Sequence, residues 1–431
     1  MLTQAIAGFE LKELQELFEP IENHKSIGLA VSGGADSLAL IVLVHRWLQM
    51  RAAGPRIVVY TMDHGLRKEA ASECENVEQI AGQYGFEVRT LMWRGEKPTT
   101  GMQAAARHAR YNLMGQAMRE EGVEILLTGH HGDDQAETVL MRLAHSSGLN
   151  GLRGMEKTAV IMGTNVFRPF LTLPKSRLVN VINEAGLKIA VDPSNEDAKY
   201  ERVRWRQMRG ALAEMGLTSS VLSKFAARMG RANAALEEIA QNAYYSDVKN
   251  DQFGVGSILH KTLIGLGAET GIRVLSRMIF TASGGRSKGE LGQLEMSVDL
   301  IKNQHFKGVA VGGCMVQKYQ DIIVVFREAF RVSELTSELL PAEKMIWDQR
   351  FSITNNTDMP LKIKLADSVT REVIEKLMAQ KINVPMAGLR ATPLVVDQRN
   401  ATLAIGAHSF TPGVICELVE YEKEQFNFVV S

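Results

Sequence analysis

The chain has 431 residues, and its 49 lysines and arginines are balanced by 49 aspartates and glutamates, so its formal net charge is zero. This length predicts two or three domains. The charge balance excludes a chain that is basic throughout, so any nucleic-acid contact must come from locally gathered cations. The three cysteines, Cys74, Cys314 and Cys416, lie far apart and form no CxxC pair. That pattern suits a reducing compartment and argues against a disulfide framework or a structural zinc site.

The sequence has no segment typical of export or of membrane insertion. Its first residues include acidic side chains and lack the basic stretch and apolar core of a secretory signal. The longest apolar run, residues 38–44, is far too short to cross a bilayer. We therefore expect a cytoplasmic protein with no membrane partner.

Apolar runs that suit strands alternate with helical patterns over the first 150 residues. We expect strands at 26–32, 56–62, 86–93 and 123–129, and helices at 38–50, 69–85, 101–122 and 133–148. Strand starts recur about every thirty residues, the length of a β-α-β unit. The strands are nearly continuous apolar runs, as expected when helices cover both faces of a sheet. This predicts an α/β fold with a doubly wound, mostly parallel sheet.

The pattern changes after about residue 150. Helical patterns dominate to about residue 280, and strand-like runs then continue to the C-terminus, the last at 426–431, with one helix at 371–381. We expect three domains: a catalytic α/β domain at 1–215, a mainly helical domain at 216–334, and a small α+β domain at 335–431.

Ligands of open parallel sheets sit outside the carboxyl ends of the strands. In this chain that rule points to residues 32–37, 63–67 and 129–134. The first of these segments reads SGGADS, and it lies between a predicted strand and a predicted helix.

The SGGADS loop has the chemistry of an anion site. Glycines let the backbone approach a phosphate, and the N–H groups of a loop and a first helical turn have no internal partner. Ser32 and Ser37 add hydroxyl donors, and Asp36 beside a phosphate implies a cation between them, which indicates Mg²⁺. The spacing matches neither G-x-x-x-x-G-K-[ST] nor G-x-G-x-x-G. The alternative is a tight turn whose Ser and Asp cap a helix.

Basic residues gather between about residues 175 and 231. Such a local strip in a neutral chain suits the phosphates of a nucleic acid, and its alternative is a solvated helix face. Trp205 can stack on an RNA base or belong to the core.

The SGGADS loop resembles the pyrophosphate-binding loop of the N-type ATP pyrophosphatases, the PP-loop superfamily. Three further stretches, MDHGLRKEA, QAAARHARYNLM and LLTGHHGDDQAETVLMRLAHSSGLNGLRGM, together resemble the tRNA(Ile)-lysidine synthetases of that superfamily. The resemblance is strong over about residues 26–210 and looser to the C-terminus. One departure is visible, because Arg202-Val203-Arg204 stands where the family usually has Arg-Asn.

The resemblance implies that ATP adenylates carbon 2 of the wobble cytidine in the CAU-anticodon isoleucine tRNA, and that free L-lysine then displaces AMP. ATP and Mg²⁺ are the implied cofactors, and a homodimer is compatible with the sequence. One rival is a PP-loop tRNA thiolase, which needs a nucleophilic cysteine or an iron–sulfur cluster. A second rival is an RNA-binding protein with a dead nucleotide site.

The resemblance also implies roles for individual residues. The nucleotide is assigned to Ser32, Gly33, Gly34, Ala35, Asp36, Ser37, Asp63, His64 and Gly129. The catalytic residues are expected to be Asp36, Arg107, His130, Asp133 and Asp134, with His131 beside them, and the metal carboxylates to be Asp36 and Asp134. The tRNA is assigned to Arg110, Lys175, Arg177, Arg202, Arg204, Arg206 and Arg209.

Each of these assignments has a plain structural alternative. Asp134 can cap a helix together with Glu137, and Asp63 and His64 can belong to an ordinary turn. Arg107 and Arg110 lie on one face of a predicted helix, which can simply be solvated.

Overall fold

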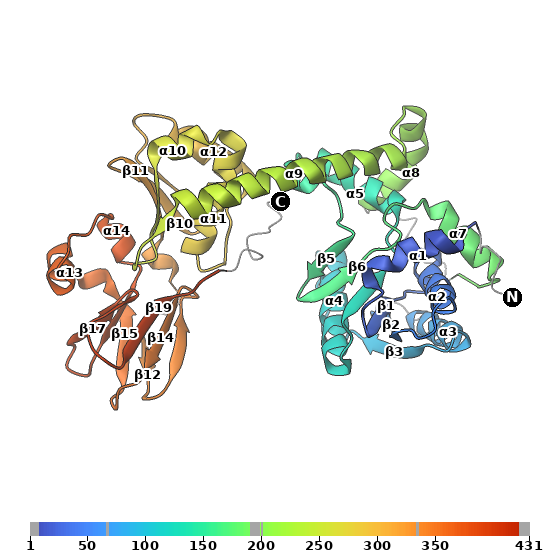
Figure 1. Cartoon of the computed structure of the whole chain (residues 1–431), viewed down its shortest axis with the longest axis horizontal. Helices are drawn as coiled ribbons and strands as arrows, with labels where there is room; N and C mark the ends of the chain where they lie inside the picture. The colour runs from blue at the N-terminus through green and yellow to red at the C-terminus, as the bar shows by residue number, and fades with distance from the viewer. Residues whose placement is uncertain (1–7, 66–68, 190–198, 200, 333–335, 422–431) are drawn as a thin grey trace. The chain divides into compact units, whose positions relative to one another are not determined.

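The computed structural model describes residues 8–65, 69–189, 199, 201–332 and 336–421. The chain forms two compact units that divide between Gly230 and Arg231 (Figure 1). That division falls within one long helix, α9 (Ser219–Asp247). The predicted three-domain division stays a prediction. The predicted strand at 426–431 and residues 66–67 of the predicted ligand edge lie outside the described residues.

The first unit is built on a six-stranded sheet with the order β3-β2-β1-β4-β6-β5. Neighbouring strands are parallel except β5, which is antiparallel to β6. The expected α/β fold with a mostly parallel sheet is therefore confirmed. The strands are β1 Ser26–Ala30, β2 Arg56–Asp63, β3 Glu87–Met92, β4 Ile125–Thr128, β5 Thr158–Ile161 and β6 Thr164–Phe167.

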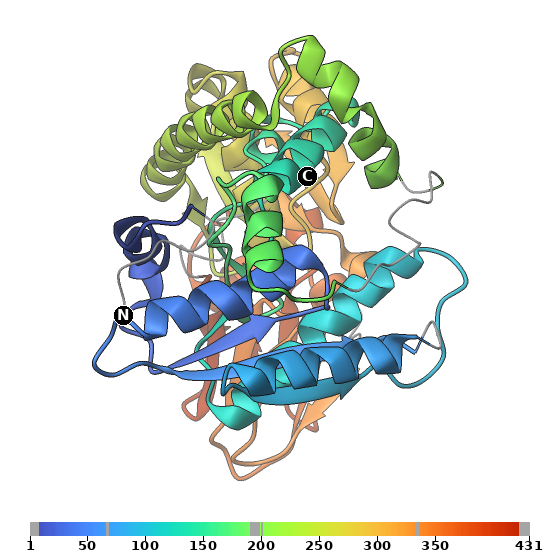
Figure 2. The same cartoon turned by 90° about the vertical axis from the view of Figure 1, so that its right-hand side faces the viewer.

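Helices cover both faces of this sheet because alternate strand residues point to opposite sides. Ile27 and Leu29 of β1 pack in a cluster with α1, α2, α3 and α7, whereas Val58 and Tyr60 of β2 pack against α4 (Figure 2). The helices are α1 Leu11–Phe18, η1 Glu19–Ile21, α2 Ala35–Leu48, α3 Ala70–Gln83, α4 Met102–Glu121, α5 Gly132–Ala144, α6 Leu149–Leu152, α7 Lys175–Glu184 and α8 Glu201–Glu214.

The second unit contains a five-stranded antiparallel sheet with the order β7-β8-β11-β10-β9. Two of its strands, β7 and β8, interrupt the stretch that the sequence predicted to be helical, and the short strand lengths explain why they were missed. The elements are β7 Lys249–Asn250, β8 Gly256–Leu259, α10 His260–Gly265, α11 Ala268–Ala282, α12 Leu291–Ile301, β9 Gly308–Val311, β10 Cys314–Tyr319, β11 Ile322–Arg327 and η3 Ala329–Arg331.

Strand β11 is apolar on both sides because both faces of its sheet are covered. Ile323 and Val325 pack with α11 and α12, whereas Val324 and Phe326 pack with residues of the C-terminal part, such as Ile374 and Leu389. The C-terminal part has two sheets, with the orders β12-β15-β16-β17-β18 and β13-β14-β19. Its elements are β12 Thr336–Leu339, β13 Lys344–Trp347, β14 Phe351–Asn355, β15 Leu361–Leu365, η4 Ala366–Ser368, α13 Arg371–Met378, α14 Met386–Leu389, β16 Pro393–Val396, β17 Thr402–Ile405, β18 His408–Ser409 and β19 Val414–Leu418.

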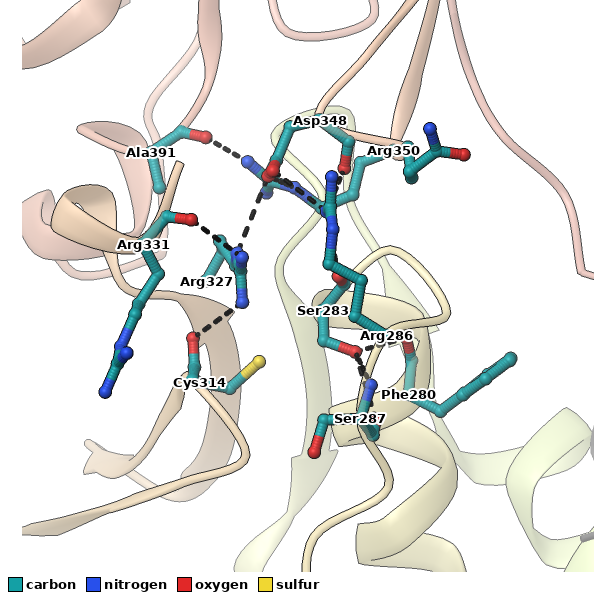
Figure 3. A network of polar contacts seen from close by, with 12 residues as sticks. Phe280, Ser283, Arg286, Ser287, Cys314, Arg327, Arg331, Asp348, Arg350 and Ala391 are labelled. Atoms are coloured by element: carbon teal, nitrogen blue, oxygen red, sulfur yellow. Dashed lines mark hydrogen bonds and ion pairs between the residues drawn. The ribbon is translucent and has the colours of Figure 1, made fainter. Parts of the chain in front are cut away.

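A buried carboxylate joins three segments of the second unit (Figure 3). Asp348 lies in the turn between β13 and β14, has a φ of +47° and is fully buried. Its oxygens accept hydrogen bonds from Arg286 Nη1 (2.9 Å), in the loop after α11, and from Arg350 Nε (2.7 Å). Arg327 Nε, at the end of β11, lies 3.6 Å from the same carboxylate. One negative charge therefore lies among three guanidinium groups, two of them buried.

Within the described ranges, no helix is long and apolar enough to cross a bilayer.

Replacing Asp348 by Asn should destabilise the second unit by about 3–5 kcal/mol, because removing one partner of a buried ion pair leaves uncompensated buried charge. Urea unfolding followed by the fluorescence of buried Trp347 measures this loss. Asp358→Asn, at an exposed site, is the matched control. An equal midpoint for the two variants would contradict the role given to Asp348.

Candidate active site

The glycine loop between β1 and α2 is closed on itself by Ser37. The backbone N–H of Ser32 donates to Ser37 Oγ (3.1 Å), and Ser37 Oγ donates to the carbonyl oxygen of Gly34 (2.9 Å). Gly33 has a φ of +81°, which favours glycine. The loop thus leads directly into the first turn of α2, and the start of a helix is where backbone N–H groups can bind an anion.

Two positions at this edge of the sheet, 129 and 34, are occupied by glycine for different physical reasons. A Cβ on Gly129 would lie 2.5 Å from the carbonyl oxygen of Asp36, so only glycine lets the end of β4 approach α2. A Cβ on Gly34 would meet no atom closer than 3.9 Å, and its φ of −76° is ordinary. The protein itself does not demand glycine at position 34, so its absent side chain leaves room for a ligand.

A cavity of about 700 Å³ opens at the carboxyl ends of β1, β2 and β4. It holds many of the predicted site residues and lies within the first unit. The predicted residues that line it are Ser32, Gly34, Asp36, Ser37, His64, Arg110, Gly129, His130, Asp134 and Arg202.

Asp36 is held by a histidine and a lysine. Its Oδ2 lies 3.4 Å from His131 Nε2 and 3.2 Å from Lys175 Nζ. Burial raises the pKa of Asp36, but the hydrogen bond from His131 and the charges of His131 and Lys175 outweigh it and keep the pKa below its usual value. Its other oxygen, Oδ1, is buried and makes no hydrogen bond to a described residue.

Two carboxylates share the imidazole of His131, which is buried at the start of α5. The backbone N–H of Asp134 donates to His131 Nδ1 (3.3 Å), and the backbone N–H of His131 donates to Asp134 Oδ2 (3.1 Å). The cap of α5 is therefore His131 with Asp134, not Asp134 with Glu137. Burial lowers the pKa of His131, but the hydrogen bond to Asp36 and the charges of both carboxylates raise it further than burial lowers it.

His130 has the opposite electrostatic surroundings. Its Nδ1 lies 2.8 Å from Thr128 Oγ1. Burial lowers the pKa of His130 to about 3, and the nearby charges of Arg168 and Arg107 act in the same direction, against Asp134. His130 is therefore neutral at physiological pH and carries no positive charge toward a phosphate.

The acidic residues of α5 are paired with the basic helix α8. Glu137, which is buried, accepts from Arg206 Nε (2.9 Å) and lies 3.1 Å from Arg202 Nε. Asp133 accepts from Arg209 Nη1 at 2.6 Å and does not line the cavity. Three of the predicted tRNA arginines, Arg202, Arg206 and Arg209, are thus paired with acids of α5.

Other predicted residues are spread around the cavity. Arg110 Nη2 lies 3.2 Å from His64 Nε2, whereas Arg107 is exposed with its guanidinium 5.0 Å from the ring of Tyr111. Asp63 does not line the cavity, and its carboxylate accepts from the backbone N–H of Gly65 (2.7 Å), as in an ordinary turn.

The remaining basic residues divide into structural and exposed ones. Arg177 pairs with Glu13 and lies over the ring of Phe9, so it anchors α1 and does not line the cavity. Arg204 is exposed and donates to the carbonyl oxygen of Lys199 (3.0 Å). Trp205 packs partly buried beside α5 and donates to Glu201, as in its core alternative.

Sequence reasoning missed three residues near the cavity. Thr128 lines it and contacts His130, Glu137 holds two arginines, and Arg168 is buried with its charge near His130. The sequence offered no local signal for Glu137, because its partner Arg206 lies 69 positions away. Arg168 directly follows β6, which the sequence analysis did not predict.

The side chains around the cavity fit a Mg²⁺ ion only in part. Among the described residues, no group of three or more His, Cys, Asp or Glu side chains is arranged to hold a metal ion. Asp36 Oδ1 is nevertheless a buried carboxylate oxygen without a partner beside the phosphate loop. Mg²⁺ commonly takes one or two carboxylates and completes its shell with phosphate oxygens and water.

Comparison with known proteins bears on the family. A model described as "PP-loop domain" matches residues 9–210. A tRNA(Ile)-lysidine synthase from Bradyrhizobium diazoefficiens is 40% identical over 312 residues, 69% of this chain and 84% of the relative. One from Rhodopseudomonas palustris is 41% identical over 293 residues, 67% and 84% of the two chains. One from Brucella anthropi is 32% identical over 396 residues, 88% and 84%.

This chain belongs to the tRNA(Ile)-lysidine synthase family. The predicted family is therefore confirmed, and these relatives favour it over the thiolases. A solved U34-tRNA thiolase, NcsA from Methanococcus maripaludis with its [4Fe-4S] cluster, has a TM-score of 0.44 and 15% identity over 51% of this chain and 77% of that chain. That likeness is too low to bear on function.

Gly129→Ala tests the contact that shapes this synthase-family cavity. The added methyl group would overlap the backbone of Asp36 and displace α2. We expect a loss of about 1–3 kcal/mol in the stability of the first unit, as for other overpacked sites, and weaker ATP binding by calorimetry.

Gly82→Ala is the matched control, because a Cβ there meets nothing within 4 Å. It should leave ATP binding unchanged and stabilise α3 by about 0.4–1 kcal/mol. Unchanged ATP affinity in Gly129→Ala would mean that α2 can shift without disturbing the cavity.

Proposed function

We propose that this chain joins lysine to carbon 2 of the wobble cytidine of the CAU-anticodon isoleucine tRNA, using ATP and releasing AMP and pyrophosphate. The observation that carries the proposal is the glycine loop at Gly33–Gly34, which borders a cavity lined also by Asp36, His130 and Asp134. Membership of the tRNA(Ile)-lysidine synthase family supports the same reaction.

In the first step, oxygen 2 of the cytidine attacks the α-phosphorus of ATP and pyrophosphate leaves. We assign the departing phosphates to the N–H groups at the start of α2 and to the Ser32 hydroxyl, which would lower the barrier mainly by positioning and charge stabilisation. Ser37 supports this assignment indirectly, because its hydroxyl donates to Gly34 and keeps the loop closed. Bound Mg²⁺ would neutralise phosphate charge, and Asp36 and Asp134 are the carboxylates that we assign to it. The open Oδ1 of Asp36 supports this assignment.

In the second step, the ε-amine of lysine attacks carbon 2, its extra proton is lost, and AMP leaves with oxygen 2. The ammonium form of the incoming lysine needs a carboxylate partner before it loses its proton. Asp133 and Asp134 are the candidates. Asp134 lines the cavity, whereas Asp133 would have to exchange Arg209 for the substrate.

We assign the tRNA phosphates to the helices α8 and α9. Exposed Arg204, Lys224 and Arg228 are cations on this part of the surface. Arg202, Arg206 and Arg209 are compensated by acids of α5, so they contribute less free positive charge. Lys175 is engaged by Asp36, and its ammonium can also reach an anion bound at the loop.

The thiolase alternative has little support in the first unit. Cys74 is its one cysteine. That thiol lines the cavity, but burial raises its pKa, which disfavours the reactive thiolate. A homodimer and a cytoplasmic location stay predictions.

Incubation with isoleucine tRNA, labelled lysine and ATP tests the proposal. We expect lysine in the anticodon and an equal amount of pyrophosphate. Sulfur incorporation without lysine transfer would favour the thiolase, and tRNA binding without either would favour the dead-site alternative.

Asp36→Ala should abolish pyrophosphate release and leave tRNA affinity nearly unchanged, because Asp36 faces the phosphates and not the α8–α9 surface. Asp299→Ala, at an exposed acid of the second unit, is the control and should keep full activity. Lost tRNA binding in Asp36→Ala would contradict this placement of the site.

Arg204→Glu should weaken tRNA binding and reduce the slope of log affinity against log salt by about 1 for each lost phosphate contact. Lys12→Glu, an exposed charge reversal on α1, is the control. Equal affinities and slopes, measured by fluorescence anisotropy across a salt series, would remove Arg204 from the interface.

A further inference from the structure

We propose that Thr128 is a positioning residue that holds His130 as a neutral imidazole with its proton on Nε2, so that His130 donates a hydrogen bond into the nucleotide cavity. The inference rests on the proposed function for its chemical meaning. The hydrogen-bond geometry on which it is built does not depend on that function.

Thr128 and His130 lie at the carboxyl end of β4, where the strand turns toward α5. Thr128 is the last residue of β4 and is 5% exposed. Its Oγ1 lies 2.8 Å from His130 Nδ1, and both residues line the cavity. His130 Nε2 makes no hydrogen bond to a described residue, and it is the ring nitrogen left for a ligand.

The direction of the Thr128–His130 hydrogen bond follows from counting protons. A buried hydroxyl has one proton to place, and among the described residues the only side-chain partner of Thr128 Oγ1 is His130 Nδ1. If Nδ1 carried a proton and donated it, the hydroxyl proton would have no acceptor among the described residues. The arrangement that satisfies both groups has Thr128 donating to Nδ1, and a neutral imidazole then carries its proton on Nε2.

His131 is fixed in the same tautomer by a different donor. The backbone N–H of Asp134 donates to its Nδ1, so its Nε2 proton faces the carboxylates of Asp36 and Asp134, each 3.4 Å away. The two neighbouring imidazoles thus have the same tautomer, but their Nε2 protons face different groups. The Nε2 proton of His131 faces the carboxylates of Asp36 and Asp134, whereas that of His130 faces the cavity.

This tautomer excludes one role and favours another. An imidazole whose Nε2 is protonated cannot accept the proton of the incoming lysine at that atom, so His130 is not the base of the second step. A neutral N–H donor can bind a phosphate oxygen and gains strength as negative charge grows there during adenylation. The nearby guanidinium of Arg168 also opposes a second proton on the ring.

Nitrogen-15 spectra of the full chain with labelled histidine test the tautomer directly, because protonated and unprotonated ring nitrogens have well-separated shifts. His130→Gln assigns the signals. We expect the wild type and Thr128→Ser to have the proton of His130 on Nε2, and Thr128→Val, which keeps the shape but not the hydroxyl, to contain the Nδ1-protonated form.

Kinetics supply the second readout. Thr128→Val should slow pyrophosphate release by about tenfold to a hundredfold, as for other residues that orient a functional histidine, with the KM for ATP nearly unchanged. Thr128→Ser should restore the rate. Unchanged signals from the other histidines would show that Thr128→Val is folded.

The outcomes separate this inference from the proposed function. A wild-type His130 protonated on Nδ1, or an unchanged tautomer in Thr128→Val, would overturn the role of Thr128 whatever reaction the protein catalyses. Absence of lysine transfer by the wild type would overturn the proposed function and leave the tautomer result intact.

Discussion

The close approach of α2 to the backbone of Gly129 is the constraint on which the site depends. Because no side chain fits between them, the start of α2 and the end of β4 meet at backbone distance. Asp36 then reaches the imidazole that caps α5, and the phosphate loop and the acidic helix become two walls of one cavity. The approach of α2 to Gly129 fixes this arrangement, and the other polar contacts of the cavity adjust it.

Ion pairs within the first unit reduce the free positive charge of its basic strip. The sequence indicated a row of cations for RNA, but three of those arginines lie on Glu137 and Asp133. Helix α8 is therefore attached to the helix that carries the acidic residues of the site. A polyanion that approached this surface would compete with those acids for the arginines.

Much of the first unit could be predicted from sequence, because its signals are local. Long apolar runs located β1, β2 and β4. The hairpin β5–β6 was missed because β5 alternates exposed and half-buried residues, and Thr164 and Asn165 break the apolar run of β6. Strand β7 has only two residues, and only Ile258 and Leu259 of β8 are apolar.

The cavity residues were found through the SGGADS and GHHGDD segments, whereas their partners were not. Arg206 meets Glu137 across 69 positions, and Arg177 meets Glu13 across 164. Such pairs form only when the fold brings distant segments together, and nothing local in the sequence announces them. Trp205 was left open between stacking and core, and its packing beside α5 agrees with the core alternative.

The Asp348 cluster has a consequence for how this protein can change over generations. A substitution at Asp348 leaves three guanidinium groups facing one another, whereas loss of any single arginine still leaves the carboxylate with two cations. Loss of the acid therefore leaves more unbalanced positive charge than loss of any one arginine. Substitutions that remove the arginines first would pass through less strained intermediates than one that removes the aspartate first.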